Sequence, residues 1–172
     1  MPNASAHRRI VLMGVAGCGK SAVGAALAAR LDAVYLDGDD LHPPENIAKM
    51  RRGEPLTDED RWPWLTLVGR TLADPHGTLI LGCSALKRRY RDHIRKEAGA
   101  PVIFVHLAGT KQLITARMAA RTGHFMPTTL IDSQFDALEA PTPDERPITI
   151  DINASLEAIV SAIAAELEET PA

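Results

Sequence analysis

Short apolar runs alternate along the chain with longer segments in which apolar residues recur every three or four positions, the spacing of a helix with one buried face. The short runs are continuously apolar, which is typical of strands covered on both faces in a parallel sheet. Strands that alternate with helices predict an α/β fold with right-handed crossovers. We expect strands at 10–13, 34–36, 78–81, 102–106 and 148–150, and helices at 19–31, 44–52, 58–73, 86–97, 110–121, 127–138 and 155–168.

Length and composition indicate one ordinary globular domain. The chain has 172 residues, 45% of them hydrophobic and 24% charged, and we expect a single domain over 1–172 with a flexible tail at 1–8. The net charge of -3 argues against a nucleic-acid partner. No segment approaches the roughly 20 apolar residues of a membrane span. With only two cysteines, the chain cannot build a disulfide framework, so we expect a reduced, cytoplasmic protein.

Residues 14–21 read Gly-Val-Ala-Gly-Cys-Gly-Lys-Ser and match the phosphate-binding loop G-x-x-x-x-G-K-[ST], with a strand before it and a helix after it. Glycines let the backbone N–H groups point at a phosphate, and the following helix adds its positive end. Lys20 is expected to reach the β- and γ-phosphates, and the Ser21 hydroxyl to bind magnesium. The loop therefore predicts ATP and Mg2+ as cofactors. The nucleotide-binding residues expected here are Gly14, Gly17, Cys18, Gly19, Lys20, Ser21 and Ala22.

Acidic residues follow the second strand at Asp37, Asp39 and Asp40, at the strand end where open α/β sheets bind their ligands. The third strand ends in Gly-Cys-Ser at 82–84 and lacks the aspartate that often supports magnesium there. We therefore assign Asp37 to magnesium, through water, and Asp39 to the acceptor hydroxyl as orienter or base. The alternative is a polar turn that caps the next helix, which is the interpretation we favour for Asp40.

The rest of the chain carries motifs that are narrow to one family. They include Leu36-Asp-Gly-Asp39, Leu41-His-Pro43, Gly53-Glu-Pro-Leu56, Asp58-x-Asp-Arg61, Cys83-Ser-Ala-Leu-Lys87 and Asp144-Glu-Arg146. With these motifs the sequence closely resembles bacterial-type gluconokinases, and more widely shikimate kinase and the nucleoside monophosphate kinases. The resemblance implies transfer of the ATP γ-phosphate to the 6-hydroxyl of D-gluconate, and a homodimer. It also implies a P-loop NTPase fold with a five-stranded parallel sheet in the order 2-3-1-4-5, flanked by helices, with a helical lid.

The acceptor-binding segment is expected at about 39–66. Gluconate joins a carboxylate to a polyol, so its site needs a cationic donor at one end and hydroxyl-binding groups along it. Arg61 is the expected carboxylate clamp, because guanidinium binds a carboxylate through two hydrogen bonds. The other expected acceptor-binding residues are Asp39, His42, Lys49, Ser84, Lys87 and Gln134. For Gln134 the open alternative is a polar helix surface, and for Arg52 it is solvated surface charge. Trp62 and Trp64 are expected to pack against the protein.

A lid is expected at about 117–130. Arg117 and Arg121 lie four residues apart and share one helical face, and Gly123 can act as a hinge. Closure would bring both guanidinium groups over the phosphates and exclude water. The alternative is a solvent-facing basic helix. The loop at 152–154 is expected, by analogy with related kinases, to line the adenine pocket. The expected catalytic residues are thus Lys20, Asp39, Arg117 and Arg121.

Two other functions stay open at this level. One is a P-loop kinase for a different small acceptor, such as shikimate or a nucleoside monophosphate. The other is a nucleotide-dependent switch that transfers no phosphate to a metabolite. The combination of Asp39, Arg61 and a lid disfavours the switch, because a switch needs no acceptor pocket.

Overall fold

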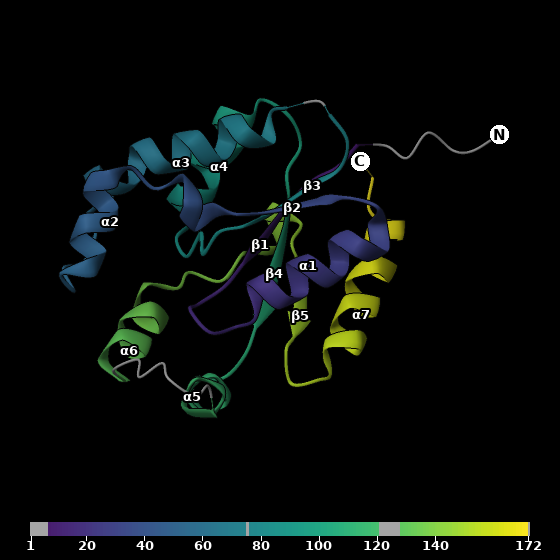
Figure 1. The fold of residues 1–172 in the computed structure, drawn as a ribbon. Helices are drawn as coiled ribbons and strands as arrows, with labels where there is room; N and C mark the ends of the chain where they lie inside the picture. Colours follow the sequence, from purple (N-terminus) through teal and green to yellow (C-terminus); the bar gives the residue numbers. More distant parts are fainter. Residues whose placement is uncertain (1–6, 75, 121–127, 172) are drawn as a thin grey trace.

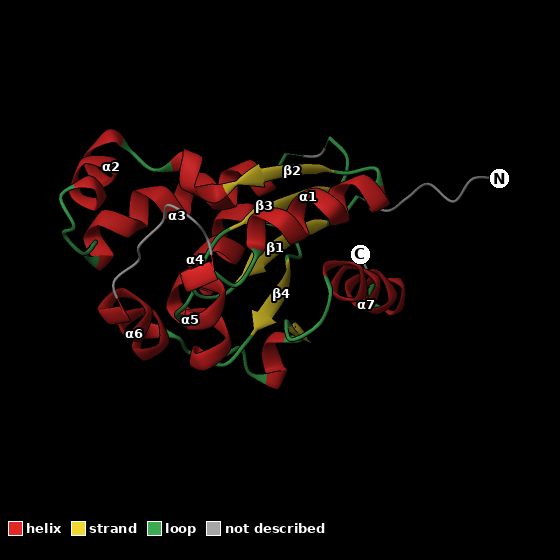
Figure 2. Ribbon diagram, turned by 60° about the horizontal axis from the view of Figure 1, so that its bottom comes forward, coloured by secondary structure: helices red, strands yellow, loops and turns green. Residues whose placement is uncertain are grey.

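The computed structural model describes residues 7–74, 76–120 and 128–171. Within them the strands form one parallel five-stranded sheet in the order β2-β3-β1-β4-β5, as predicted. The strands are β1 (Arg9–Met13), β2 (Val34–Asp37), β3 (Leu79–Gly82), β4 (Ile103–Ala108) and β5 (Ile148–Asp151). Figure 2 shows the sheet between two groups of helices. Because all the strands run the same way, their carboxyl ends meet at one edge of the sheet, where ligands bind in such folds.

Each predicted helix is present, with ends within two residues of those expected. The helices are α1 (Lys20–Leu31), α2 (Pro44–Arg51), α3 (Asp58–Leu72), α4 (Arg88–Ala98), α5 (Lys111–Ala120), α6 (Thr128–Ala137) and α7 (Leu156–Glu169). In Figure 1, α1 and α7 lie on one side of the sheet and α3 and α4 on the other. Two helices are capped by side chains at their N-terminal ends. Ser155 accepts a hydrogen bond from the backbone of α7, and Thr57 and Asp60 form a reciprocal capping box at the start of α3.

The central strand β1 separates two apolar cores. Ile10 and Leu12 pack into the core beneath α1 and α7, whereas Val11 and Met13 pack into the core beneath α3 and α4. All four side chains are fully buried. A strand with both faces covered has no polar position to offer, which explains its uninterrupted apolar sequence.

The prediction that every strand is covered on both faces is wrong at the sheet edges. In β2, Val34 is 57% and Leu36 38% exposed. Among the described residues, the core beneath α3 and α4 draws on β1, β3 and β4 but contains no side chain of β2. In β5, Thr149 and Asp151 are exposed while Ile148 and Ile150 are buried. Edge strands therefore keep one open face, even when their sequence is as apolar as that of a central strand.

The predicted tail ends before Arg8, so the expectation of a loose segment through residue 8 is wrong at that position. The Arg8 backbone N–H donates to the Thr78 hydroxyl, and its carbonyl accepts from the Leu79 N–H at 3.0 Å. Its guanidinium also donates to the carbonyl of Leu167 in α7. Arg8 thus extends the contact between β1 and β3 by one residue. Residues 1–6 lie outside the described part of the chain. No helix in that part combines the length and apolarity needed to cross a membrane.

Candidate active site

The phosphate-binding loop joins β1 to α1 and is held tightly in its curved form. Gly17 has φ of +84°, a left-handed conformation, and a Cβ there would collide with the Met118 side chain of α5. The Lys20 ammonium folds back over the loop and donates to the carbonyls of Gly14 at 3.0 Å and Val15 at 3.2 Å. The lysine therefore already stands where the loop would enclose an anion.

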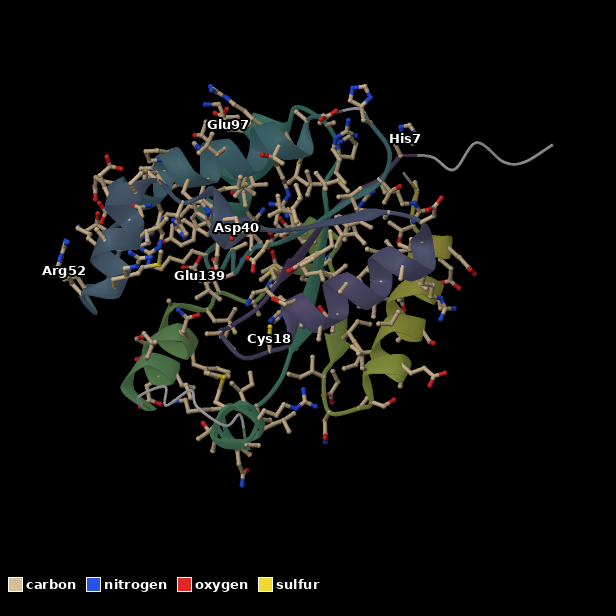
Figure 3. All side chains as sticks on the ribbon, viewed as in Figure 1. His7, Cys18, Asp40, Arg52, Glu97 and Glu139 are labelled. Carbon is tan, nitrogen blue, oxygen red and sulfur yellow. The ribbon has the colours of Figure 1, made fainter. Side chains whose placement is uncertain are left out.

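The start of α1 is open to an anion. Its N-cap residue, Gly19, makes no side-chain cap, and the first turn of the helix holds no acidic residue. The first N–H groups of the helix are then free of intrahelical partners, and the helix dipole adds positive potential. Ser21 and Ala22 are exposed at this end. Cys18, labelled in Figure 3 beside the start of α1, is buried and packs within the loop.

Asp37 and Asp39 stand opposite the phosphate loop, at the end of β2. The Asp37 carboxylate accepts a hydrogen bond of 2.9 Å from the Asp39 N–H and so caps the 3-10 turn Gly38–Leu41. Although residue 39 is exposed at the surface, the protein around its carboxylate, and then the charge of Asp37, raise the pKa of Asp39, while Lys20 lowers it. The charge of Lys20 on the phosphate loop thus acts on the Asp39 carboxylate. A carboxylate with a raised pKa is a better proton acceptor than an ordinary one.

Trp64 of α3 fixes that turn from behind. Its indole N–H donates to the Gly38 carbonyl at 2.8 Å, and its ring stacks on the His42 ring with 4.1 Å between centroids. Trp62 contacts the ring of Tyr90 edge-on. Both tryptophans pack, as expected. Trp64 attaches α3 to the turn that carries Asp39, and Trp62 packs α3 against α4.

His42 is buried and electrically neutral. Burial, and then the charge of Arg61, lower the pKa of His42 to about 4. Its Nδ1 lies 3.2 Å from the amide nitrogen of Asn46, which also donates to the Asp60 carbonyl at 2.9 Å. Asn46 was not among the predicted site residues. A buried asparagine on a short helix, four residues after His42, is the signal that points to it. The Lys49 ammonium binds the Asp60 carboxylate at 2.8 Å.

Arg61 is held in place but remains partly accessible, with 30% of its side chain exposed. One of its nitrogens donates to the Tyr90 hydroxyl at 3.3 Å and lies 3.7 Å from the Asp58 carboxylate. The Tyr90 hydroxyl donates to Asp58 at 2.6 Å, and Arg89 pairs with the same carboxylate. Arg89 is a second cation at this end of the site that sequence reasoning missed, since it stands in a run of basic residues that reads as surface charge.

The loop after β3 meets the phosphate loop. The carbonyl of Ser84 accepts a hydrogen bond of 3.2 Å from the Gly14 N–H, and Lys87 is the residue before α4. Between them Ala85 adopts a left-handed conformation with φ of +44°. Cys83 is fully buried, and burial raises the pKa of its thiol to about 12. This thiol packs in the core beneath α3 and α4.

The structure places Gln134 differently from expectation. Gln134 of α6 accepts a hydrogen bond of 3.1 Å from the Ala16 N–H, so it contacts the phosphate loop instead of the acceptor segment. This follows from the packing of α6, whose Ile131 joins the core that contains Ile114 and Met118 of α5.

Arg117 of α5 reaches the carbonyl of Ile152 after β5, at 2.6 Å. That contact puts Arg117 beside the loop expected to line the adenine pocket. Arg121 and the hinge Gly123 lie outside the described residues. Arg52, at the outer end of α2 in Figure 3, pairs with Glu54 at 2.9 Å on the surface, which agrees with the solvated alternative.

The oxygen donors near the phosphate loop fit a magnesium ion. Within the described residues no cluster of three or more His, Cys, Asp or Glu side chains is suited to a metal. Magnesium in kinases needs none, because one or two protein oxygens and the phosphates of the nucleotide hold it. Burial is the main influence on the pKa of Tyr35. The Ser21 hydroxyl lowers that pKa, and the charges of Asp37 and Asp39 raise it. Ser21 lies in the first turn of α1 and Asp37 ends β2, so both oxygens lie at the edge of the sheet that carries the phosphate loop.

Comparisons with known proteins identify the family of the chain. A family model described as an AAA domain matches residues 10–141. The "Thermosensitive gluconokinase" of Escherichia coli (strain K12) is 50% identical over 153 residues, which cover 86% of this chain and 81% of that protein. The chain belongs to the gluconokinase family. The crystal structure of a gluconokinase from Sinorhizobium meliloti 1021 superposes on this member with a TM-score of 0.89, at 45% identity over 95% of this chain and 93% of that one.

More distant structures share only the fold with this gluconokinase-family chain. The shikimate kinase from Acinetobacter baumannii, solved in complex with shikimate, has a TM-score of 0.63 and 19% identity over 95% of this chain and 94% of that one. The wider resemblance to shikimate kinase seen in the sequence is therefore a resemblance of architecture.

Proposed function

We propose that this protein transfers the γ-phosphoryl group of ATP to the 6-hydroxyl of D-gluconate and releases 6-phosphogluconate and ADP. Membership of the gluconokinase family supports the choice of acceptor. The observation that carries the chemistry is that Asp39, just after β2, lies near enough to Lys20 of the phosphate loop for the lysine charge to lower its pKa. A cation on a phosphate-binding loop then faces a carboxylate positioned for a hydroxyl group, which is the arrangement that phosphoryl transfer needs.

The proposed reaction is an in-line attack of the 6-hydroxyl on the γ-phosphorus. Lys20 and the first N–H groups of α1 hold the phosphates and stabilise their charge. Asp39 orients the hydroxyl and accepts its proton as the new P–O bond forms and the bond to the ADP oxygen breaks. Because the transition state is loose, placement of the hydroxyl matters more than the strength of the base. Arg117 and Arg121 are proposed to close over the transferring group as part of a lid.

Ser21 and, through water, Asp37 are proposed to hold Mg2+. When bound, the ion neutralises charge on the β- and γ-phosphates. The contribution of the chain is to present these two oxygens from α1 and β2 on either side of the phosphate loop. The Asp37 carboxylate is already oriented by its hydrogen bond from the Asp39 N–H, so little rearrangement is needed to load the site.

Acceptor recognition is proposed to centre on Arg61, whose exposed guanidinium face binds the gluconate carboxylate. Tyr90 and Asp58 keep that guanidinium in place, so less side-chain freedom is lost on binding. The polyol then extends toward Asp39 past neutral His42, whose Nδ1 accepts from the Asn46 amide and whose Nε2–H is left to donate. Lys49, Ser84 and Lys87 are the remaining proposed contacts, and Gln134 acts instead on the phosphate loop.

The test is ADP release with Mg-ATP across D-gluconate, shikimate, glycerate and nucleoside monophosphates, with a no-acceptor control. A rate that depends strongly on D-gluconate supports the proposal. If only another acceptor raises the rate, the assignment of the phosphate-binding residues stands and the assignment of D-gluconate as acceptor is overturned. If ADP release is the same with every acceptor and with none, a nucleotide-dependent switch is favoured.

A homodimer and a cytoplasmic location also belong to the proposal, on the basis of the family resemblance and the reduced cysteines. Light scattering on a size-exclusion column tests the first: a mass near twice the 18.6 kDa of the chain supports the dimer, and a mass near the single value contradicts it. Cell fractionation tests the second.

A further inference from the structure

The hydroxyl of Tyr35 is buried and, among the described residues, is the one buried side-chain oxygen or nitrogen without a hydrogen-bond partner. Tyr35 lies on β2, two residues before Asp37. A buried hydroxyl without a partner is unfavourable, and native proteins keep such groups for a reason. A phenylalanine at this position would fill the same space without that penalty. The position of the hydroxyl therefore needs an explanation.

Two glycines make room for this ring. A Cβ at Gly24 of α1 would overlap the ring carbons of Tyr35, and a Cβ at Gly82 of β3 would overlap its hydroxyl oxygen. The ring is thus clamped between α1 and the end of β3, and the hydroxyl has one well-defined place. That place is the carboxyl edge of the sheet, between the phosphate loop and the acidic turn.

The groups around the hydroxyl are those of the proposed magnesium site. Burial is the largest influence and raises the pKa of Tyr35, while the nearby Ser21 hydroxyl lowers it. The charges of Asp37 and Asp39 raise it further. Ser21 thus lies next to the Tyr35 hydroxyl without completing a hydrogen bond to it.

The Tyr35 hydroxyl occupies the space beside Gly82, where β3 has no side chain. The last residues of β3 and its loop, 82–84, carry no carboxylate, although an acidic residue after this strand often supports the metal in P-loop enzymes. The space that a side chain at Gly82 would enter is filled by the Tyr35 hydroxyl from the neighbouring strand. A polar group is therefore present at that point, supplied by β2 instead of β3.

We propose that Tyr35 is a positioning residue for Ser21, whose hydroxyl proton it accepts so that the serine oxygen directs a lone pair at magnesium. A serine hydroxyl rotates freely, and it can lend a lone pair to a cation only if its proton points elsewhere. Tyr35 supplies the acceptor for that proton, and its own O–H turns toward the acidic turn. The inference rests on the proposed kinase function and adds to it one residue that touches neither nucleotide nor acceptor.

The test is ADP binding to the full chain by calorimetry, with magnesium and with EDTA, for the wild type, Tyr35→Phe, Ser21→Ala and the double variant. In EDTA, Tyr35→Phe binds ADP as the wild type does. With magnesium, its affinity falls about five- to tenfold, the effect of one lost hydrogen bond to a polarised group. Its melting temperature without nucleotide is unchanged or higher, because an unpartnered hydroxyl is removed. In the Ser21→Ala background, Tyr35→Phe has no further effect on magnesium-supported binding.

Equal magnesium-supported affinities for Tyr35→Phe and the wild type would overturn the inference and leave the proposed function standing. A loss of the same size in EDTA would also overturn it, since the hydroxyl would then act on the fold of the loop. An additive loss in the double variant would show that Tyr35 does not act through Ser21. If the wild type bound ADP equally well with magnesium and with EDTA, the proposed magnesium site would be overturned, and the inference with it.

Discussion

Arg91 and Glu145 form a buried, two-pronged ion pair behind the active site. The Arg91 guanidinium donates to both carboxylate oxygens, at 2.8 and 3.0 Å, and the two side chains are 0% and 1% exposed. A third nitrogen of Arg91 donates to the carbonyl of Ala85 at 2.9 Å. The pair therefore joins α4 to the turn before β5, and it secures the left-handed residue that follows Ser84 at the edge of the phosphate loop.

Replacing Glu145 with glutamine should destabilise the protein severely. The change leaves the Arg91 charge buried without a counter-charge, and breaking such a pair typically costs about 3–5 kcal/mol. Urea unfolding, followed by circular dichroism, measures the loss. The matched control is Glu54→Gln, which breaks the exposed pair with Arg52 and should change stability little. Equal midpoints for Glu145→Gln and wild type would contradict the prediction.

Glu145 should also make stability fall in acid. Burial alone would raise its pKa, but hydrogen bonds from Arg91 and Arg95 outweigh burial and lower the pKa to about 2, from an ordinary value of 4.5. Because the unfolded chain takes up this proton first, the stabilisation is complete above pH 4.5 and is lost as the pH falls toward 2. The shift corresponds to about 3 kcal/mol. Unfolding free energies between pH 6 and 3 should decline in the wild type, and less steeply in Glu145→Gln.

Much of the fold was predictable because its signals are local. The phosphate loop is one continuous motif, and the uninterrupted apolar run of β1 follows from burial on both faces. The covered-strand rule failed at Val34, because the sequence of a strand does not reveal whether a helix reaches its outer face.

The parts of the site that sequence reasoning missed depend on contacts between distant segments. Gln134 meets the backbone of Ala16 because α6 packs beside α5, and nothing near residue 134 encodes that arrangement. The Arg91–Glu145 pair consists of two charged residues that read as solvated when taken alone. Tyr35 reads as an ordinary strand aromatic, and its hydroxyl becomes notable only once Gly24 and Gly82 are seen to enclose it.

Asp39→Asn should lower kcat by about a hundredfold or more and leave the KM for ATP nearly unchanged. The amide keeps the size of the side chain but cannot accept the proton of the 6-hydroxyl, and general-base catalysis is worth about 10²–10⁴ in rate. Coupled-enzyme detection of ADP at saturating D-gluconate measures the effect. Asp40→Asn is the matched control on the same turn, since Asp40 is exposed and has no assigned role. Near-normal turnover in Asp39→Asn would remove Asp39 from the mechanism.

Arg61→Ala should raise the KM for D-gluconate about 10- to 100-fold and spare the KM for ATP. The carboxylate loses a charge-assisted contact worth about 1.5–3 kcal/mol. The KM of Arg61→Lys for D-gluconate should lie between those of the wild type and Arg61→Ala, because a lysine supplies the charge without the two parallel hydrogen bonds of a guanidinium. Initial rates against both substrates separate the effects, with Arg52→Ala as the exposed-arginine control. An unchanged KM for D-gluconate in Arg61→Ala would move the carboxylate clamp elsewhere, with Arg89 the next residue to test.

Gln134→Ala should weaken the binding of ATP more than the binding of D-gluconate. The glutamine oxygen holds the Ala16 N–H of the phosphate loop, so its loss loosens the loop, and one hydrogen bond of about 1 kcal/mol corresponds to about a fivefold rise in the KM for ATP. Ser133→Ala is the matched control, because the Ser133 hydroxyl donates within its own helix, to the Leu130 carbonyl. A rise confined to the KM for D-gluconate would return Gln134 to the acceptor site and indicate that α6 moves toward the acceptor helices during the reaction.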